Sequence, residues 1–144
     1  MKVLLLDPNI AGRAVQPPHN LPQLKAYLRE RTKHRAALLD FTFRKTAWRA
    51  ELARAMDREK PDLIGISCQS LNYAQAVEVA AFVRSRSGLP ILFGGVHAIL
   101  APEEVIATEG ACWSPVVSDR PDNSPAFTRN SSPAGIPFGA YQRP

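Results

Sequence analysis

The chain has 144 residues, of which 45% are hydrophobic and 22% charged, and its formal charge is +5. This length suits one domain with a substantial core and leaves no room for two. The two cysteines, Cys68 and Cys112, are too few for a disulfide framework, a zinc site or an iron–sulfur cluster within this chain.

Most of the excess positive charge lies between Lys25 and Lys60. No nucleic-acid motif is present and no aromatic residues are spaced as stacking platforms, so solvated helix faces explain the charge better than a nucleic-acid partner does. A weak contact with an acidic partner is the alternative. Residues 1–8 are too short an apolar run for a signal peptide, and no run reaches membrane-spanning length. We therefore expect a cytoplasmic protein with no membrane partner.

Apolar runs typical of buried strands alternate with amphipathic helical patterns. The expected strands lie at residues 3–6, 35–43, 63–66 and 91–93. The expected helices lie at residues 20–33, at 46–58, from 72 onward and from 101 onward. Their inward faces would carry Leu21, Leu24 and Leu28, then Trp48, Leu52, Ala55 and Met56, and then Ala76, Val79, Ala80 and Val83. This alternation predicts an α/β fold with a doubly wound parallel sheet.

Polar or glycine-rich segments follow three of the expected strands. The first is a loop after residue 7 of about 13 residues, which is longer than most connections in α/β proteins. The second follows the strand at 63–66, which is apolar on both faces and so belongs in the middle of the sheet. It consists of Ser67, Cys68, Gln69 and Ser70, and Asn72 then opens a helix. The third, residues 94–98, is expected to be a loop with Gly94, Gly95 and His97.

These three segments predict a ligand site at one edge of the sheet. With a strand order of 2-1-3-4, the chain reverses direction between strands one and three, where open α/β sheets bind ligands at the carboxyl ends of strands. Hydroxyl and amide side chains, with two adjacent glycines, favour a wide and mostly neutral ligand over a nucleotide phosphate. We interpret His97 as a polar loop residue rather than a metal ligand, and Cys68 as a small buried side chain.

No catalytic constellation is recognisable. The dinucleotide fingerprint, the phosphate loop and the nucleophile elbow are all absent from the sequence. No pair of a nucleophile and a base can be identified either, so an independent enzyme is the least favoured interpretation.

Three blocks of sequence, MKVLLLDP, KPDLIGISC and FGGVHA followed by APEEV, together resemble the N-terminal cobalamin-binding domain of B12-dependent radical SAM proteins. The resemblance covers residues 1–110 approximately. It implies a flavodoxin-like (Rossmann-like) fold that presents cobalamin to a radical SAM methyltransferase-type catalytic domain and is itself non-catalytic. The implied cofactor contacts are Asp7, Pro8, Asn9, Gly12, Ser67, Cys68, Gln69, Ser70, Asn72, Gly94, Gly95 and His97.

The resemblance also implies how the cofactor would be held. Related domains have Asp-x-His-x-x-Gly after the first strand, and their histidine coordinates cobalt from below. Residues 7–12 read DPNIAG, with Asn9 in the place of that histidine. Because an amide is a poor cobalt ligand, we expect base-off cobalamin without histidine coordination. Ser67 keeps the serine of the family's Ser-x-Leu motif, and Gly94 and Gly95 match the glycine pair that admits the nucleotide tail.

The chain departs from the family after residue 110. The fifth strand is expected to be missing or degenerate, and the barrel with its Cys-x-x-x-Cys-x-x-Cys motif is absent from the sequence. We therefore predict a cobalamin-binding-like domain over residues 1–110 and a tail over 111–144, rich in Pro, Ser and Asn, that is disordered. The alternative function is a cofactor-free α/β interaction domain or structural remnant.

Overall fold

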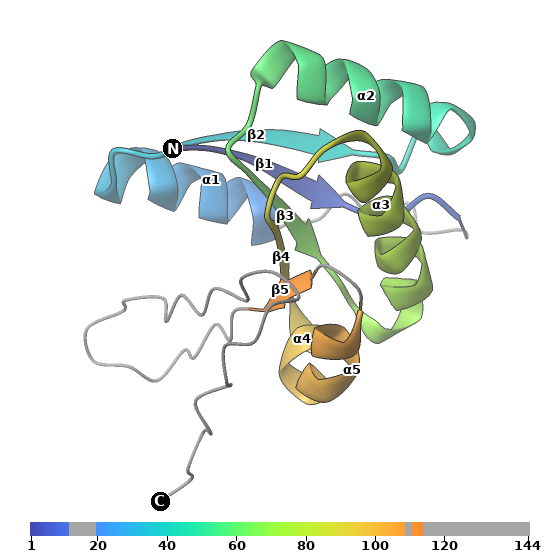
Figure 1. The fold of residues 1–144 in the computed structure, drawn as a ribbon. Coiled ribbons are helices and arrows are strands. Elements are labelled where there is room, and N and C mark those ends of the chain that lie inside the picture. Colours follow the sequence, from blue (N-terminus) through green and yellow to red (C-terminus); the bar gives the residue numbers. More distant parts are fainter. Residues whose placement is uncertain (12–19, 109–110, 114–144) are drawn as a thin grey trace, which may run out of the picture.

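The computed structural model of the chain describes residues 1–11, 20–108 and 111–113 (Figure 1). Strands and helices alternate as predicted, with two short 3₁₀ helices before α2 and α3. In chain order the elements are β1 (Lys2–Asp7), α1 (Asn20–Arg31), β2 (Arg35–Asp40), η1 (Lys45–Ala47), α2 (Trp48–Glu59), β3 (Leu63–Ser67), η2 (Ser70–Asn72), α3 (Tyr73–Arg86), β4 (Ile91–Gly94), α4 (Val96–Leu100), α5 (Pro102–Ala107) and β5 (Ala111–Trp113).

All strand pairs are parallel, and the sheet has the order β2-β1-β3-β4-β5. The predicted order of the first four strands is therefore confirmed, as is the flavodoxin-like architecture. The fifth strand is present but has only three residues, which pair with β4. It begins one residue after the predicted end of the domain at residue 110. The rest of the predicted tail lies outside the described residues.

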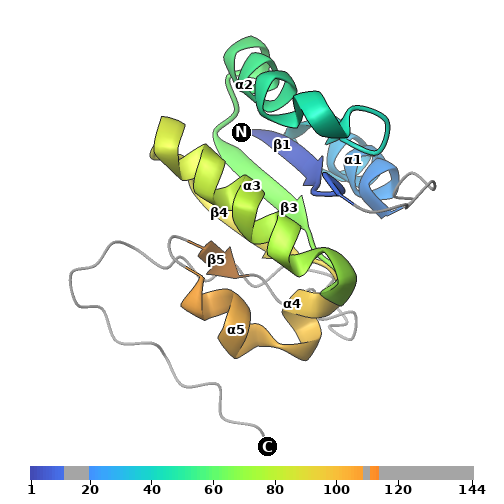
Figure 2. The same ribbon diagram turned by 90° about the vertical axis from the view of Figure 1, so that its right-hand side faces the viewer.

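The two faces of the sheet are covered by different helices. The connection from β1 to β2 runs toward one edge of the sheet, whereas each later connection runs toward the other edge. Because such crossovers are right-handed, α1 lies on one face and α2 and α3 lie on the opposite face (Figures 1 and 2).

The face under α2 and α3 carries the main core. Its largest fully buried side chains include Leu4, Leu6, Ile64, Ile66 and Phe93 from the strands and Leu52, Val79 and Val83 from the helices. The inward faces predicted for the second and third helices are confirmed, since all eight residues are buried.

The face under α1 carries a smaller apolar cluster. Its buried members are Val3, Leu5, Leu21 and Leu63. The apolar stripe predicted for the first helix is only partly correct, because Leu21 is buried and Leu28 half-buried while Leu24 remains 43% exposed.

The segment after β4 differs from the prediction. Residues 94–98 do not form a loop, because Gly94 completes β4 and α4 begins at Val96. Helix α5, in the region where a helix was predicted from residue 101 onward, starts with Pro102 in its first turn, followed by Glu103 and Glu104 at the positive end of the helix dipole. In the described part of the chain, no helix combines the length and apolar character needed to cross a membrane.

Candidate functional site

Four residues form a row across the carboxyl edge of the sheet. The strand register places Asp40 beside Asp7 and Ser67 beside Gly94. Leu6 pairs with Ile66, so the next residues of β1 and β3, Asp7 and Ser67, also lie side by side. The residues two positions earlier share their face and belong to the α1-side cluster: Leu38, Leu5 and Leu92. We call Asp40, Asp7, Ser67 and Gly94 the carboxyl-edge row.

Helix α1 begins above this row. The amide Nδ2 of Asn20, the first residue of α1, donates a hydrogen bond of 3.0 Å to Ser67 Oγ. Gly94 is beside Ser67, and a Cβ atom added to Gly94 would meet no atom of the described residues within 4 Å. The α1 side of the carboxyl edge therefore combines a hydroxyl, an amide and open space over a glycine.

The other half of the row contains two carboxyl groups. Burial and, to a smaller extent, the neighbouring Asp40 carboxylate raise the pKa of Asp7 from 3.8 to about 6, although a hydrogen bond donated by the Asn9 backbone N–H opposes both effects. Asp40 Oδ1 accepts hydrogen bonds from the Thr42 backbone N–H at 2.8 Å and from Thr42 Oγ1 at 2.6 Å. Asp7 therefore titrates close to neutral pH, whereas Asp40 is tied to the loop after β2.

The loop after β1 is fixed by the residues around it. Pro8 is fully buried, and Asn9 is 7% exposed with its Nδ2 donating to Thr42 Oγ1 at 3.3 Å. The backbone N–H groups of residues 10 and 11 donate to Gln75 Oε1 at 3.1 and 3.2 Å. Pro8 and Asn9 thus support the loop, and the remaining predicted contact in this loop, Gly12, lies outside the described residues.

The ends of β3 and β4 are joined through their backbones. Cys68 N–H donates to Gly94 O at 2.7 Å, and His97 N–H donates to Cys68 O at 3.2 Å. Gly95 has φ of 98°, and a Cβ atom there would lie 2.5 Å from Cys68 O. Gly95 is therefore required by backbone packing, unlike Gly94. The Cys68 side chain is fully buried, as predicted, and burial raises the pKa of its thiol, which keeps it protonated.

A capping box closes the turn that leads into α3. The Gln69 backbone N–H donates to Asn72 Oδ1 at 2.7 Å, and the Gln69 side chain accepts a hydrogen bond from the Asn72 backbone in return. Gln75 is not part of this box, because its Oε1 accepts hydrogen bonds from the loop after β1.

His97 is the centre of a second group of side chains. It is 8% exposed, so the prediction of a polar loop residue is wrong. Its Nδ1 lies 3.1 Å from Ser70 Oγ, and its ring stacks against Tyr73 with 4.1 Å between ring centroids. Its Nε2 lies 3.3 Å from Glu104 Oε2, without the alignment of a hydrogen bond. We call Ser70, Tyr73, His97 and Glu104 the His97 cluster.

Sequence reasoning missed several members of both groups. The predictions placed Asn20 at the start of a helix and Asp40 within the strand expected at residues 35–43, and these positions were the available signal. Tyr73 and Glu104 gave no signal, because their contacts with His97 depend on how α3 and α5 pack. The described residues contain no group of His, Cys, Asp or Glu side chains that could hold a metal ion.

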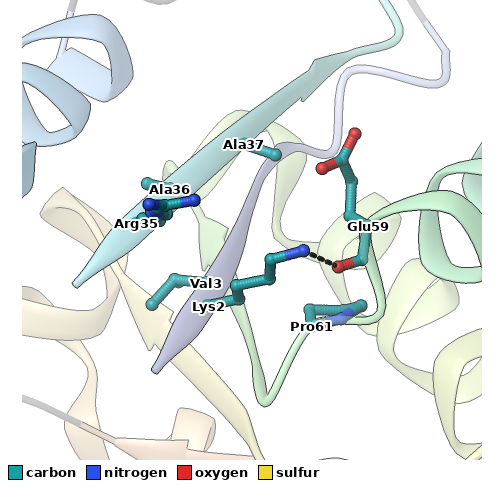
Figure 3. Close-up of a pocket in the computed structure, with 7 residues that line it drawn as sticks. All are labelled: Lys2, Val3, Arg35, Ala36, Ala37, Glu59 and Pro61. Atoms are coloured by element: carbon teal, nitrogen blue, oxygen red, sulfur yellow. Dashed lines mark hydrogen bonds between the residues drawn. The ribbon is translucent and has the colours of Figure 1, made fainter.

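A depression of about 250 Å³ lies at the opposite, amino edge of the sheet (Figure 3). Its floor is small and apolar, and Lys2 Nζ at its rim donates to the Glu59 backbone carbonyl at 3.0 Å. The residues that line it are Lys2, Val3, Arg35, Ala36, Ala37, Glu59 and Pro61. It contains none of the residues predicted to bind a ligand.

Comparison with known proteins agrees with this architecture. No curated protein sequence matches the chain. Two solved structures of TsrM from Kitasatospora setae, a radical S-adenosylmethionine methyltransferase, share 22% sequence identity with it. One, with tryptophan substrate and a SAM analog bound, has a TM-score of 0.62, and the other, with cobalamin and a [4Fe-4S] cluster bound, has a TM-score of 0.63.

Both alignments cover 70% of this chain, but only 20% and 19% of the respective TsrM chains. The chain thus spans about a fifth of the length of these neighbours, which share its fold. The model of the B12 binding domain family matches residues 12–115, which is more than half of the sequence. The chain therefore belongs to the B12-binding domain family.

Proposed function

We propose that this domain binds cobalamin at the carboxyl edge of its sheet, on the α1 side. The observation that carries the proposal is the open space over Gly94 beside the Ser67 hydroxyl. A cofactor segment that lies along the sheet needs such a gap, because any larger residue at position 94 would fill it. The Ser67 and Asn20 side chains supply polar groups at its border.

The two adjacent glycines have different roles in this proposal. Gly94 provides room for the nucleotide tail, whereas Gly95 lets the backbone approach Cys68. Ser67 and Asn20 would hold and orient the tail. When bound, cobalamin would supply the organometallic chemistry, and the protein would supply binding and orientation.

The cofactor is proposed to bind base-off, without a histidine ligand from this chain. Asn9 stands where related domains have their histidine, and its amide is buried and bonded to Thr42. His97 is buried with Nδ1 against Ser70, and His34 precedes β2 at the amino edge of the sheet. The Asp7 carboxyl also lies at this edge and would meet the cofactor as a group that titrates near neutral pH.

A radical SAM catalytic domain is the proposed partner, and the transfer reaction would take place there. The fold shared with one part of TsrM supports this assignment. The absence of a nucleic-acid partner stays a prediction, although Arg44, Arg49 and Arg54 of the basic region are paired with Glu51 and Glu78. A cytoplasmic location and a disordered tail also stay predictions.

The test is a visible-absorbance titration of the full chain with hydroxocobalamin, comparing Gly94→Leu with Gly88→Leu. Within the described part of the chain, a Cβ atom added to either glycine would meet no atom within 4 Å, but Gly88 precedes β4 at the amino edge. We expect saturable formation of a base-off spectrum in the parent and in Gly88→Leu. We expect at least a tenfold loss of affinity in Gly94→Leu, because leucine fills the space beside Ser67.

Circular dichroism of the three proteins shows whether each of them is folded, so that a loss of binding can be distinguished from a loss of structure. A folded parent that produces no spectral change with hydroxocobalamin would overturn the proposal and leave the cofactor-free interaction domain or remnant. Equal affinities of the two leucine variants would place the cofactor somewhere other than over Gly94.

A further inference from the structure

The His97 cluster contains a nucleophile and a base that are in contact. Ser70 lies at the start of η2 and is exposed, and its Oγ is 3.1 Å from Nδ1 of the buried His97. This distance is within the range in which a general base takes a proton from a hydroxyl. The cobalamin proposal gives the pair no chemical role, and sequence reasoning found no such pair.

A carboxylate on the far side of the imidazole completes the arrangement. Glu104 Oε2 lies 3.3 Å from Nε2, and the Glu104 side chain is 56% exposed. A negative charge there favours the tautomer with the proton on Nε2, which leaves Nδ1 free to accept the Ser70 proton. Tyr73 holds the ring from its face and donates its own hydroxyl to the Glu104 backbone carbonyl at 2.9 Å. Glu104 and Tyr73 are thus positioning residues for His97.

We propose that Ser70 is a reactive nucleophile that is acylated by carboxylic esters with an apolar acyl group. Exposed apolar side chains next to the pair indicate the substrate class. Leu71 follows Ser70 and is 94% exposed, and Val96 precedes His97 and is 49% exposed. Leu100, one turn further along α4, is 71% exposed. Such side chains would contact an apolar acyl chain attached to the carbonyl.

The chemistry balances without a cofactor. Ser70 Oγ bonds to the ester carbonyl carbon while its proton moves to His97 Nδ1. The bond between the carbonyl carbon and the alcohol oxygen then breaks, and His97 returns the proton to the leaving alcohol. In the second half, water gives a proton to His97 Nδ1 as its oxygen bonds to the carbonyl carbon of the acyl-serine. The bond between that carbon and Ser70 Oγ then breaks, and His97 returns the proton to Oγ, which releases the carboxylic acid and restores Ser70.

The experiment incubates the full chain, without cobalamin, with p-nitrophenyl butyrate and follows nitrophenol release and peptide mass. We expect a butyryl group on the peptide that contains Ser70. In Ser70→Ala the adduct should disappear and nitrophenol release should fall to the rate of the uncatalysed reaction, because the hydroxyl that is acylated is missing. Ser85→Ala, which removes an exposed serine further along α3, should behave like the parent.

Two further variants separate chemistry from folding. Glu104→Gln keeps the shape of an exposed side chain, so we expect an unchanged unfolding midpoint and about a tenfold slower acylation. In His97→Gln, with Ser70, Tyr73 and Glu104 still facing position 97, no base takes the Ser70 proton, so we expect acylation to slow by about 100-fold, the lower end of general-base effects.

An absent adduct in the folded parent, or equal nitrophenol release by Ser70→Ala, would overturn the proposal. Neither result bears on the cobalamin titration, whose key residue is Gly94.

Discussion

The two faces of the sheet are built differently. The face under α2 and α3 holds the main core, with side chains such as Phe93, Ile66 and Val79 fully buried. The face under α1 has a small apolar cluster that gives way, toward the carboxyl edge, to the carboxyl-edge row. Residues of one strand, such as Leu92 and Phe93, thus serve different purposes on opposite faces. We infer that the α2/α3 face provides most of the stability of the domain, and that the α1 face is less tightly packed and leaves space for a ligand.

The strongest test of this division uses the adjacent residues Phe93 and Leu92. Phe93 is fully buried in the main core, so Phe93→Ala should lower the free energy of unfolding by about 3–5 kcal/mol. Leu92 is only half-buried on the α1 side, so Leu92→Ala should cost about 1–2 kcal/mol. Urea denaturation of both variants measures the difference. Equal losses would mean that the two faces contribute equally.

The adjacent residues Gly94 and Gly95 provide a second test of this difference in packing, at the carboxyl edge of the sheet. Gly95→Ala combines a φ of 98° with a Cβ atom 2.5 Å from Cys68 O, and should cost about 2–3 kcal/mol. Gly94→Ala places its Cβ on the open α1 side and should change stability by no more than about 0.5 kcal/mol. Thermal unfolding of both variants distinguishes them. A destabilised Gly94→Ala would show that the α1 side is more tightly packed than we infer.

The fold could largely be predicted from the sequence because hydrophobic periodicity reports burial directly. The apolar run at residues 63–66 and the stripe from Ala76 to Val83 gave the central strand and α3. Sequence patterns did not predict the segments whose conformation depends on contacts between residues far apart in the chain. Helix α4 starts directly after Gly95, a residue whose unusual backbone follows from contact with Cys68 and not from its neighbours in sequence.

The site could be located only to a sheet edge. A prediction that polar residues follow buried strands places Asp7, Ser67 and Gly94 together, but it cannot distinguish Gly94 from Gly95. That difference arises from the parallel register and from the direction in which each residue would point a Cβ atom. The Ser70–His97 contact could not be predicted either, because it joins η2, which follows β3, to α4, which follows β4.

The Asp7 carboxyl group makes the stability of the domain depend on pH. The pKa of Asp7 is raised from 3.8 to about 6, so folding favours its protonated form. The contribution of the Asp7 carboxyl group to the free energy of unfolding is therefore fully present below pH 3.8 and is lost as the pH rises through 6. Because the group is only half-buried, we expect the loss to be about 1 kcal/mol.

Asp7→Asn does not titrate at this position and should remove that loss. The free energy of unfolding of parent and variant, measured at pH 4 and at pH 7, gives the test. The parent should lose about 1 kcal/mol more than the variant between these two values. Equal changes in both proteins would show that the α1 face does not hold Asp7 in a partly dehydrated setting.

The smallest expected effect concerns the outer part of α1. Leu24 is 43% exposed, so truncating it removes a side chain that water already reaches and leaves no closed cavity. Leu24→Ala should therefore cost no more than about 0.5 kcal/mol in urea denaturation. Leu21→Ala in the same helix provides the control, because Leu21 is 5% exposed and should cost about 2 kcal/mol or more. If the two losses were equal, α1 would be packed along its whole apolar stripe, and the α1 face would have to be regarded as a second core.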